Sequence, residues 1–301
     1  MAGGFTVRTD LALENQESFH QKHVEVRGVV VEKYTKEDAE IQTTMVKIET
    51  ENGARAMGKP IGTYITLESP NLSMPEETHL QEIAQALAME IRKLLPAQKD
   101  MEIMVVGLGN HNVTPDALGP MVVENLKMSR HIVREYGRES MENPHMTLMS
   151  GLIPGVMAQT GMESLEIIRG VVQETKPDAV IVIDALAARS MKRLSRTIQV
   201  TDTGINPGSG VGNHRNGIHE DSLGVPVIGI GVPTVVDAAT IVHDALEHML
   251  QVLEEKERAE FLDELLSPGL HTMFVTPKDV DEVIARVSLV LANAIKLALT
   301  V

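Results

Sequence analysis

Short apolar segments alternate with amphipathic helical segments from residue 102 to the end of the chain. The clearest apolar segment is AVIVIDALAA, residues 179–188, which is typical of a parallel strand covered on both faces. Other apolar, strand-like segments span residues 102–109, 146–155, 196–204 and 225–234, and helical patterns span 161–177, 235–256 and 276–299. This alternation predicts an α/β fold with an open, mostly parallel sheet.

The first third of the chain has a different pattern. Partial alternation of apolar and polar residues predicts strands over 23–33, 41–50 and 62–70, which would form a small β-rich layer or subdomain over residues 23–70. A long helix is predicted next, with Ser73 as N-cap, Glu76 completing a capping box and Pro96 ending it. Its apolar stripe consists of Leu80, Ala84, Leu87, Ile91 and Leu94.

Charge and composition exclude several classes of function. The chain of 301 residues has 27 basic and 42 acidic residues, a formal charge of −15, which repels nucleic acids and anionic membranes. It has no cysteine, so disulfides, thiol nucleophiles and thiolate metal sites are excluded. Neither a secretory signal nor an apolar run of the roughly 20 residues that span a bilayer is found. We therefore expect a cytoplasmic protein without nucleic-acid or membrane partners.

The segment MVVGLGNHNVTPDALGPMVV, residues 104–123, is predicted to form a buried strand, a glycine-containing loop and the start of a helix. The loop lacks the third glycine of the dinucleotide-binding fingerprint and the Gly-Lys-Ser/Thr ending of a P-loop, so nucleotide binding is disfavoured. It does carry Asp116 at the expected helix start. Asp116 is either an N-cap, stabilised by free backbone N–H groups, or a catalytic acid that the loop holds in position.

A second carboxyl group, Asp184, directly follows the apolar residues 180–183 at the expected end of a strand. Burying it is costly without a partner, and Arg189 or Arg193 is the structural candidate. The functional alternative pairs Asp184 with Asp116 in one crevice at the carboxyl ends of the strands. Two adjacent carboxyls have pKa values that move apart, which suits them to activate water as base and acid. Asp116 is the expected base, since a helix N-terminus would keep it ionised.

A glycine-rich segment, DTGINPGSGVGNHRNG at residues 202–217, is expected at the same crevice. It either lines a substrate channel and donates backbone N–H groups to an oxyanion, or is a tight connection that needs positive φ. His214 and His219 are either metal ligands or surface residues, and no metal site is predicted. The predicted substrate-binding residues are Asn110, Gly208, Ser209, Gly210, Asn213 and Arg215.

Several long motifs, in order along the chain, resemble the germination protease family of endospore-forming bacteria: GLGNHNVTPDALGP, PGVMAQTGMESLEII, KPDAVIVIDALAARS, TIQVTDTGINPGSGVGNHR and GVPVIGIGVPTVVDA. The resemblance implies an endopeptidase that degrades small acid-soluble spore proteins during germination. It also implies a three-layer α/β/α sheet like that of hydrogenase-maturation peptidases, a zymogen, a homotetramer and a location in the spore core. The family's two proposed catalytic aspartates correspond to Asp116 and Asp184, in an aspartic-like mechanism without a cofactor.

The N-terminal segment RTDLALE resembles the family's cleavage segments, which are similar to Thr-Glu-Ile-Ala-Ser-Glu and are cut before the apolar residue. We therefore predict self-processing between Asp10 and Leu11, with residues 1–10 as a propeptide and 11–301 as a single peptidase domain. The alternative is a frayed terminus with an accidental similarity.

Two other functions remain open at this point. One is a metal-dependent peptidase of the hydrogenase-maturation type on the same scaffold, which a chelator would inhibit. The other is a non-enzymatic or phosphate-binding protein, which would bind phosphate or a nucleoside and would tolerate Asp184→Asn.

Overall fold

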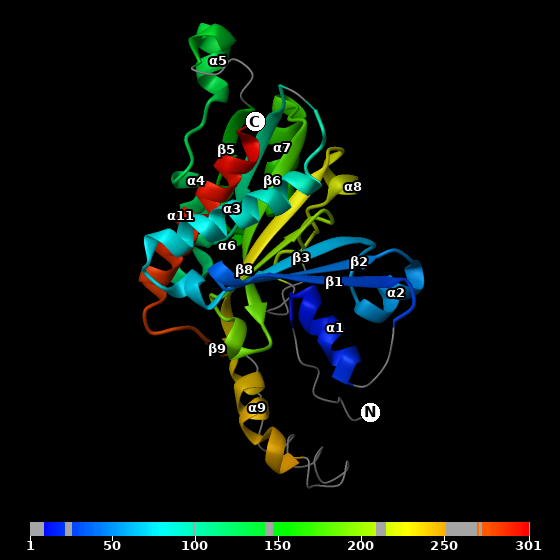
Figure 1. Ribbon diagram of the computed structural model, residues 1–301. Helices are drawn as coiled ribbons and strands as arrows, with labels where there is room; N and C mark the ends of the chain where they lie inside the picture. Colours follow the sequence, from blue (N-terminus) through cyan, green and yellow to red (C-terminus); the bar gives the residue numbers. More distant parts are fainter. Residues whose placement is uncertain are drawn as a thin grey trace.

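A computed structural model describes residues 9–21, 26–98, 100–141, 147–208, 215–250, 270 and 273–300 (Figure 1). The strands are β1 (Val29–Lys36), β2 (Ile41–Ile48), β3 (Gly62–Glu68), β4 (Glu102–Gly107), β5 (Leu148–Leu152), β6 (Ala179–Ala188), β7 (Thr197–Thr201), β8 (Val227–Asp237) and β9 (Phe274–Val275). The helices are α1 (Ala12–Gln21), α2 (Glu51–Met57), α3 (Glu77–Leu94), α4 (Leu118–Glu124), α5 (Arg130–Tyr136), α6 (Met157–Thr160), α7 (Ser164–Thr175), α8 (Glu220–Leu223), α9 (Ala238–Leu250) and α11 (Val280–Leu299).

The strands form one sheet in the order β1-β2-β3-β7-β8-β6-β4-β5, with β9 paired to β8. Strands β8, β6, β4 and β5 run parallel to one another. Strands β1, β2, β3 and β7 are joined by antiparallel pairings, and β7 also pairs antiparallel with β8. The predicted α/β class is confirmed, and the β-rich segment 23–70 contributes β1 to β3 to the same sheet.

The direction of β7 follows from the short link that precedes it. Residues 189–196 alone connect the end of β6 to the start of β7. A parallel return needs a crossover of roughly a dozen or more residues, so a link of this length reverses the chain. The strand predicted over 196–204 therefore exists, but it joins the antiparallel half of the sheet.

Helices cover both faces of the parallel strands, which gives the three layers (Figure 1). On one face, Ile181 and Ile183 of β6 belong to the same apolar cluster as buried residues of α3, α4 and α11. On the other face, Val180 and Val182 pack with residues of α7. Since each face of β6 meets an apolar layer, the continuous apolar run is explained.

Helix α3 begins later than the sequence predicted. Ser73 is not its N-cap, because it ends a short 3-10 helix over Pro70–Ser73 and its hydroxyl donates to the Pro70 carbonyl. That short helix is capped by Ser69, whose side chain accepts from the Asn71 N–H. The capping box expected at Ser73 is therefore wrong.

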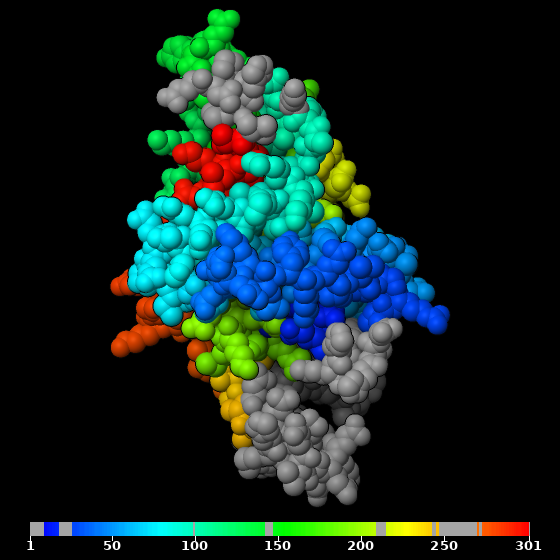
Figure 2. All heavy atoms as spheres, in the orientation of Figure 1, coloured from blue at the N-terminus to red at the C-terminus, as the bar shows by residue number. Residues whose placement is uncertain are grey.

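Side-chain contacts join the N-terminal strands to the helical layer. Figure 2 shows the β1–β2 hairpin (blue) beside α3 (cyan) on one face of the molecule. The Tyr34 hydroxyl donates to the Glu90 carboxylate at 2.7 Å, and the Lys93 ammonium lies 5.4 Å from the centre of the Tyr34 ring. Within the described part of the chain, no helix has the length and apolar character needed to cross a membrane.

Candidate active site

Asp116 lies at the end of a tight loop that follows β4. Gly109 has φ of +115°, and a side chain there would overlap the backbone carbonyl oxygen of Asp116, so the loop requires glycine. The Asp116 carboxylate accepts the backbone N–H of Asn110 at 2.8 Å. The N-cap residue of α4 is Ala117, which has no side-chain cap. The interpretation of Asp116 as a helix N-cap is therefore wrong, and its carboxylate is held by the loop instead.

Asp184 lies within β6 and not at its end, because β6 continues to Ala188 beside β8. The pairing between β4 and β6 stops one residue earlier, at Gly107 and Ile183. Asp184 is thus the first residue of β6 beyond the end of β4, where the chain of β4 turns into the loop that carries Asp116.

The structural partners that the sequence suggested for Asp184 do not bind it. Arg193 is paired with Glu14, Glu17 and Glu68, and the described residues include no ion pair to Asp184. Its carboxylate accepts the N–H of Ala185 at 2.9 Å, and the residue is 7% exposed. A buried carboxyl without a paired cation is costly unless it is protonated, which is a common property of functional acids.

Both aspartates line one cavity of about 500 Å³. Its wall also includes Asp10 of the N-terminal segment, Gly208 and Arg215. The adjacency of β4 and β6 therefore brings Asp116 and Asp184 to the same crevice, as their positions after neighbouring apolar strands suggested.

The two carboxyls differ in their electrostatic environment. Burial, followed by the charges of Asp116 and Asp10, raises the pKa of Asp184 well above its usual range, against smaller lowering effects of the Ala185 N–H and Arg215. Burial also raises the pKa of Asp116, while the Asn110 N–H and then Arg215 lower it. The arrangement favours a proton on Asp184 and a charge on Asp116, although no helix N-terminus contributes.

The segment that precedes α1 lies along the part of β6 beyond Asp184. The Asp10 N–H donates to the Ala187 carbonyl at 3.2 Å, and the Ala187 N–H donates to the Asp10 carboxylate at 3.0 Å. Leu11 is fully buried in a small apolar cluster with Leu186, Ala188 and Val236. The residues on both sides of the predicted cleavage point are therefore held in defined positions.

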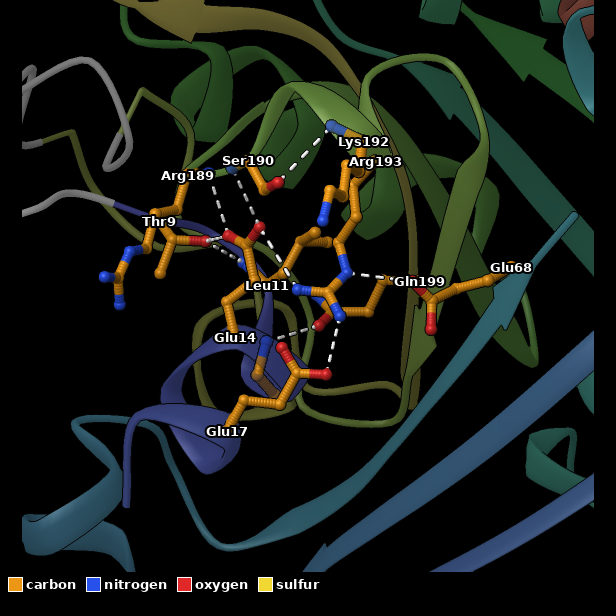
Figure 3. A network of polar contacts seen from close by, with 11 residues as sticks. Thr9, Leu11, Glu14, Glu17, Glu68, Arg189, Ser190, Lys192, Arg193 and Gln199 are labelled. Carbon is orange, nitrogen blue, oxygen red and sulfur yellow. Dashed lines mark hydrogen bonds and ion pairs between the residues drawn. The ribbon is translucent and has the colours of Figure 1, made fainter. Parts of the chain in front are cut away.

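Glu14 anchors the other end of this segment (Figure 3). Its carboxylate accepts the N–H groups of Arg189 at 2.8 Å and Ser190 at 3.1 Å, and also the Thr9 hydroxyl. The Arg193 guanidinium lies 3.4 Å from it and also binds Glu17 and Glu68. Glu14 is 3% exposed, so its charge is neutralised within the protein.

Comparison with known proteins identifies the family. A model of the family described as germination protease matches residues 7–253. The chain belongs to the germination protease family. It is 46% identical to a germination protease of Caldanaerobacter subterraneus subsp. tengcongensis, over 97% of this chain and 94% of that protein. It is 41% identical to one of Clostridium perfringens, over 98% and 95%, and 37% identical to one of Bacillus subtilis, over 98% and 94%.

Family membership makes the chain a peptidase, with a protein substrate and a role in spore germination. Among solved structures, the chain is similar to the hydrogenase maturation protease HycI of Thermococcus kodakarensis KOD1. That match has a TM-score of 0.35 and 18% identity, and it covers 69% of this chain and 99% of the other.

The predicted substrate-binding residues of the protease have different positions. Gly208 and Arg215 line the cavity, whereas Asn110 does not and instead holds Asp116 through its backbone. Ser209, Gly210 and Asn213 lie outside the described residues, as does His214. Among the described residues, no group of three or more His, Asp or Glu is placed to hold a metal ion.

Sequence reasoning missed three polar residues of the protease that contact the N-terminal segment. Arg193 was considered only as a partner of Asp184, but it binds Glu14. Lys59 and Gln199 both donate to the Asp10 carbonyl. Glu14 is the last residue of RTDLALE, the segment that resembles the family's cleavage segments, and this resemblance is the signal in the sequence that singles it out.

Proposed function

We propose that this protease is an endopeptidase that begins the degradation of small acid-soluble spore proteins and is made as a zymogen that cuts itself between Asp10 and Leu11. The observation that carries the proposal is that Asp10 lines the same cavity as Asp116 and Asp184. A segment whose residue order matches the expected cleavage segments thus lies beside two carboxyls suited to hydrolysis.

The contacts of this segment resemble those of a bound substrate. The Asp10 side chain and backbone are both bound by Ala187, in the manner of an added strand. Leu11, the residue after the cut, fills an apolar pocket, which accounts for cleavage before an apolar residue. The Glu14 carboxylate is recognised by the backbone N–H groups of Arg189 and Ser190. These contacts favour a bound segment over the alternative of a frayed terminus, which would not be buried or hydrogen-bonded in this way.

The mechanism follows from the different environments of the two acids. Asp116, ionised, takes a proton from a water molecule, whose oxygen bonds to the carbonyl carbon of Asp10. Asp184, protonated, gives its proton to the nitrogen of Leu11 as the carbon–nitrogen bond breaks. The products are a carboxylic acid on Asp10 and an amine on Leu11, and the acid gives its proton to the amine. The proton that Asp116 took then returns to Asp184, which restores both aspartates. The raised pKa of Asp184 supports its role as the acid.

The test compares wild type, Asp116→Asn and Asp184→Asn on a small acid-soluble spore protein, with cuts mapped by mass spectrometry. We expect wild type to cut after acidic residues and to remove its own residues 1–10, and both variants to do neither. Undiminished cutting by either variant would remove that aspartate from the mechanism. Parallel reactions with EDTA test the metal-dependent alternative, which predicts loss of activity on chelation.

The homotetramer and the spore-core location that the resemblance implies are part of the same proposal. Light scattering of the purified chain measures the first, and a mass near four times 32.8 kDa is expected. Imaging of a fluorescent fusion in sporulating cells measures the second, with signal outside the spore core as the contradicting result.

A further inference from the structure

Two side chains outside the aspartate pair converge on one backbone oxygen. The Lys59 ammonium donates to the carbonyl oxygen of Asp10 at 2.8 Å, and the Gln199 side-chain amide donates to the same oxygen at 3.4 Å. Lys59 follows α2, and Gln199 lies in the middle of β7. This oxygen belongs to the peptide bond that the proposed function cuts.

The orientation of Gln199 is fixed by a second contact. Its amide oxygen accepts the N–H of Ala12 at 2.8 Å, which leaves the amide nitrogen to donate to the Asp10 carbonyl. Gln199 therefore binds the peptide on both sides of Leu11, from the residue before the cut to the second residue after it. At 7% exposed, it makes these contacts away from bulk water.

The sheet register places Gln199 in line with Asp184. Gln199 of β7 is opposite Gly231 of β8, and Gly231 is opposite Asp184 of β6. Residues that are opposite one another in a sheet direct their side chains to the same face, and neighbouring strands are roughly 4.8 Å apart. Gly231 has no side chain, so the row has an acid at one end and an amide donor at the other.

Lys59 is half-buried beside this row. Burial lowers its pKa below the usual range of lysine, and the nearby charge of Asp10 opposes that effect. Lys59 and Gln199 line a second, smaller cavity of about 50 Å³ together with Asp10 and Gly231, and Asp10 also lines the cavity of Asp116 and Asp184. A cation held in such a place interacts more strongly with a full negative charge than with a neutral carbonyl.

We propose that Lys59 and Gln199 form the oxyanion site of the protease, which rests on the proposed function. When water adds to the carbonyl carbon of Asp10, the electron pair of the C=O double bond moves to the oxygen, and the new negative charge faces the two donors. When the pair returns, the bond to the Leu11 nitrogen breaks and that nitrogen takes a proton. Both residues then contact the reacting atoms and are catalytic residues.

The alternative is that Lys59 and Gln199 only anchor the N-terminal segment. An anchor lowers the occupancy of the site when it is removed, whereas an oxyanion donor lowers the rate of the chemical step. Self-processing separates the two effects, because it is a first-order reaction of one chain. Hydrogen exchange of the backbone amides of residues 10–17 reports the occupancy independently.

The experiment uses the uncut full chain and follows its cleavage by intact mass, for wild type, Lys59→Met and Lys59→Arg. For Lys59→Met we expect the first-order rate to fall about 100- to 1,000-fold, the usual loss for one oxyanion donor. Its exchange protection is expected to change less than about tenfold, and Lys59→Arg is expected to recover part of the rate because it restores a charged donor. Gln199→Leu is expected to lower both the rate and the protection.

Each other outcome is decisive. An unchanged rate for Lys59→Met, or a rate that falls only in proportion to lost protection, would overturn the oxyanion site while leaving the proposed function intact. If wild type cuts neither its own segment nor an added small acid-soluble spore protein, the proposed function fails and this inference fails with it. The reference reaction is cleavage by wild type, and it is established when Asp184→Asn abolishes that cleavage.

Discussion

Replacing Glu14 with glutamine removes the charge that holds the N-terminal segment in the cavity. The carboxylate of Glu14 accepts two backbone N–H groups and faces the guanidinium of Arg193. Glutamine has one acceptor oxygen, so its NH₂ group must face either a backbone N–H or the arginine. Both of these groups are hydrogen-bond donors, so one hydrogen bond is lost. The segment should still bind, but more weakly.

The size of the effect follows from the burial of Glu14, which is 3% exposed. Removing one partner of a buried, hydrogen-bonded charge pair costs about 2–5 kcal/mol. Arg193 keeps Glu17 and Glu68 in the variant, and one acceptor oxygen remains, so we expect the lower part of that range, about 2–3 kcal/mol. At about 1.36 kcal/mol for each factor of ten, the segment should open about 30 to 160 times more often.

Hydrogen exchange of the backbone amides of residues 10–17 measures this opening. The measurement uses an Asp184→Asn background, in which the proposed function expects the chain to stay uncut. Glu17→Gln is the matched control, because Glu17 is 39% exposed and binds the same arginine. Exposed ion pairs contribute about 1 kcal/mol or less, so exchange in the control should rise less than about fivefold. Equal, small increases for the two variants would show that burial of the Glu14 charge does not hold the segment.

Three further predictions concern the aspartates. Arg215 lowers the pKa of both, so Arg215→Gln should move both limbs of the pH–rate profile of self-processing to higher pH, and an unmoved profile would contradict the assignment. Because its folded-state pKa is raised, Asp184 stabilises the protein at acid pH and loses that contribution as the pH rises through this pKa. Calorimetry should therefore show a higher Tm for Asp184→Asn than for wild type at pH 8, by about 2–4 °C for each kcal/mol of stability that ionised Asp184 costs. Below the ordinary pKa of 3.8 the two Tm values should be equal. An unchanged Tm at pH 8 would refute the raised pKa of Asp184. Gly109→Ala should displace Asp116 and lower the rate of self-processing about 100-fold or more, with an unchanged circular dichroism spectrum. The control is Gly170→Ala, whose added methyl group meets nothing within 4 Å and which should keep full activity. Equal rates for the two variants would count against the role of the Gly109 loop.

The fold was predictable where burial leaves a strong pattern. The run 179–188 is apolar because β6 meets helices on both faces, and this alone indicates a strand in the middle of an α/β sheet. The direction of β7 depends on the length of the preceding link and on its partners, which periodicity does not encode. The start of α3 was misplaced because Ser73 matches a capping box, although Ser69 caps a shorter helix just before it.

The site was predictable only where a polar residue interrupts an apolar pattern. Asp184 stands out because it follows four apolar residues, and Asp116 because it follows a glycine loop after another apolar strand. Lys59 and Gln199 have no such signal, since a lysine after a helix and a glutamine in a strand are ordinary surface residues. Their common contact, the Asp10 carbonyl, is 49 residues from one and 189 from the other. Only the fold brings these residues together.

The Thr9 hydroxyl leaves with residues 1–10, but the other contacts that hold Leu11 and Glu14 come from the body of the protease, and this has a consequence for turnover. After a cut at that bond, Leu11 to Glu14 remain attached to the protease through α1 and still fit the site that a new substrate needs. A ligand tethered in this way competes at an effective concentration of about a millimolar and never diffuses away. If the proposed cut occurs, we expect the processed protease to be its own product inhibitor. Its activity toward other proteins then depends on how readily the new N-terminus leaves the site, a step that is separate from the cut itself.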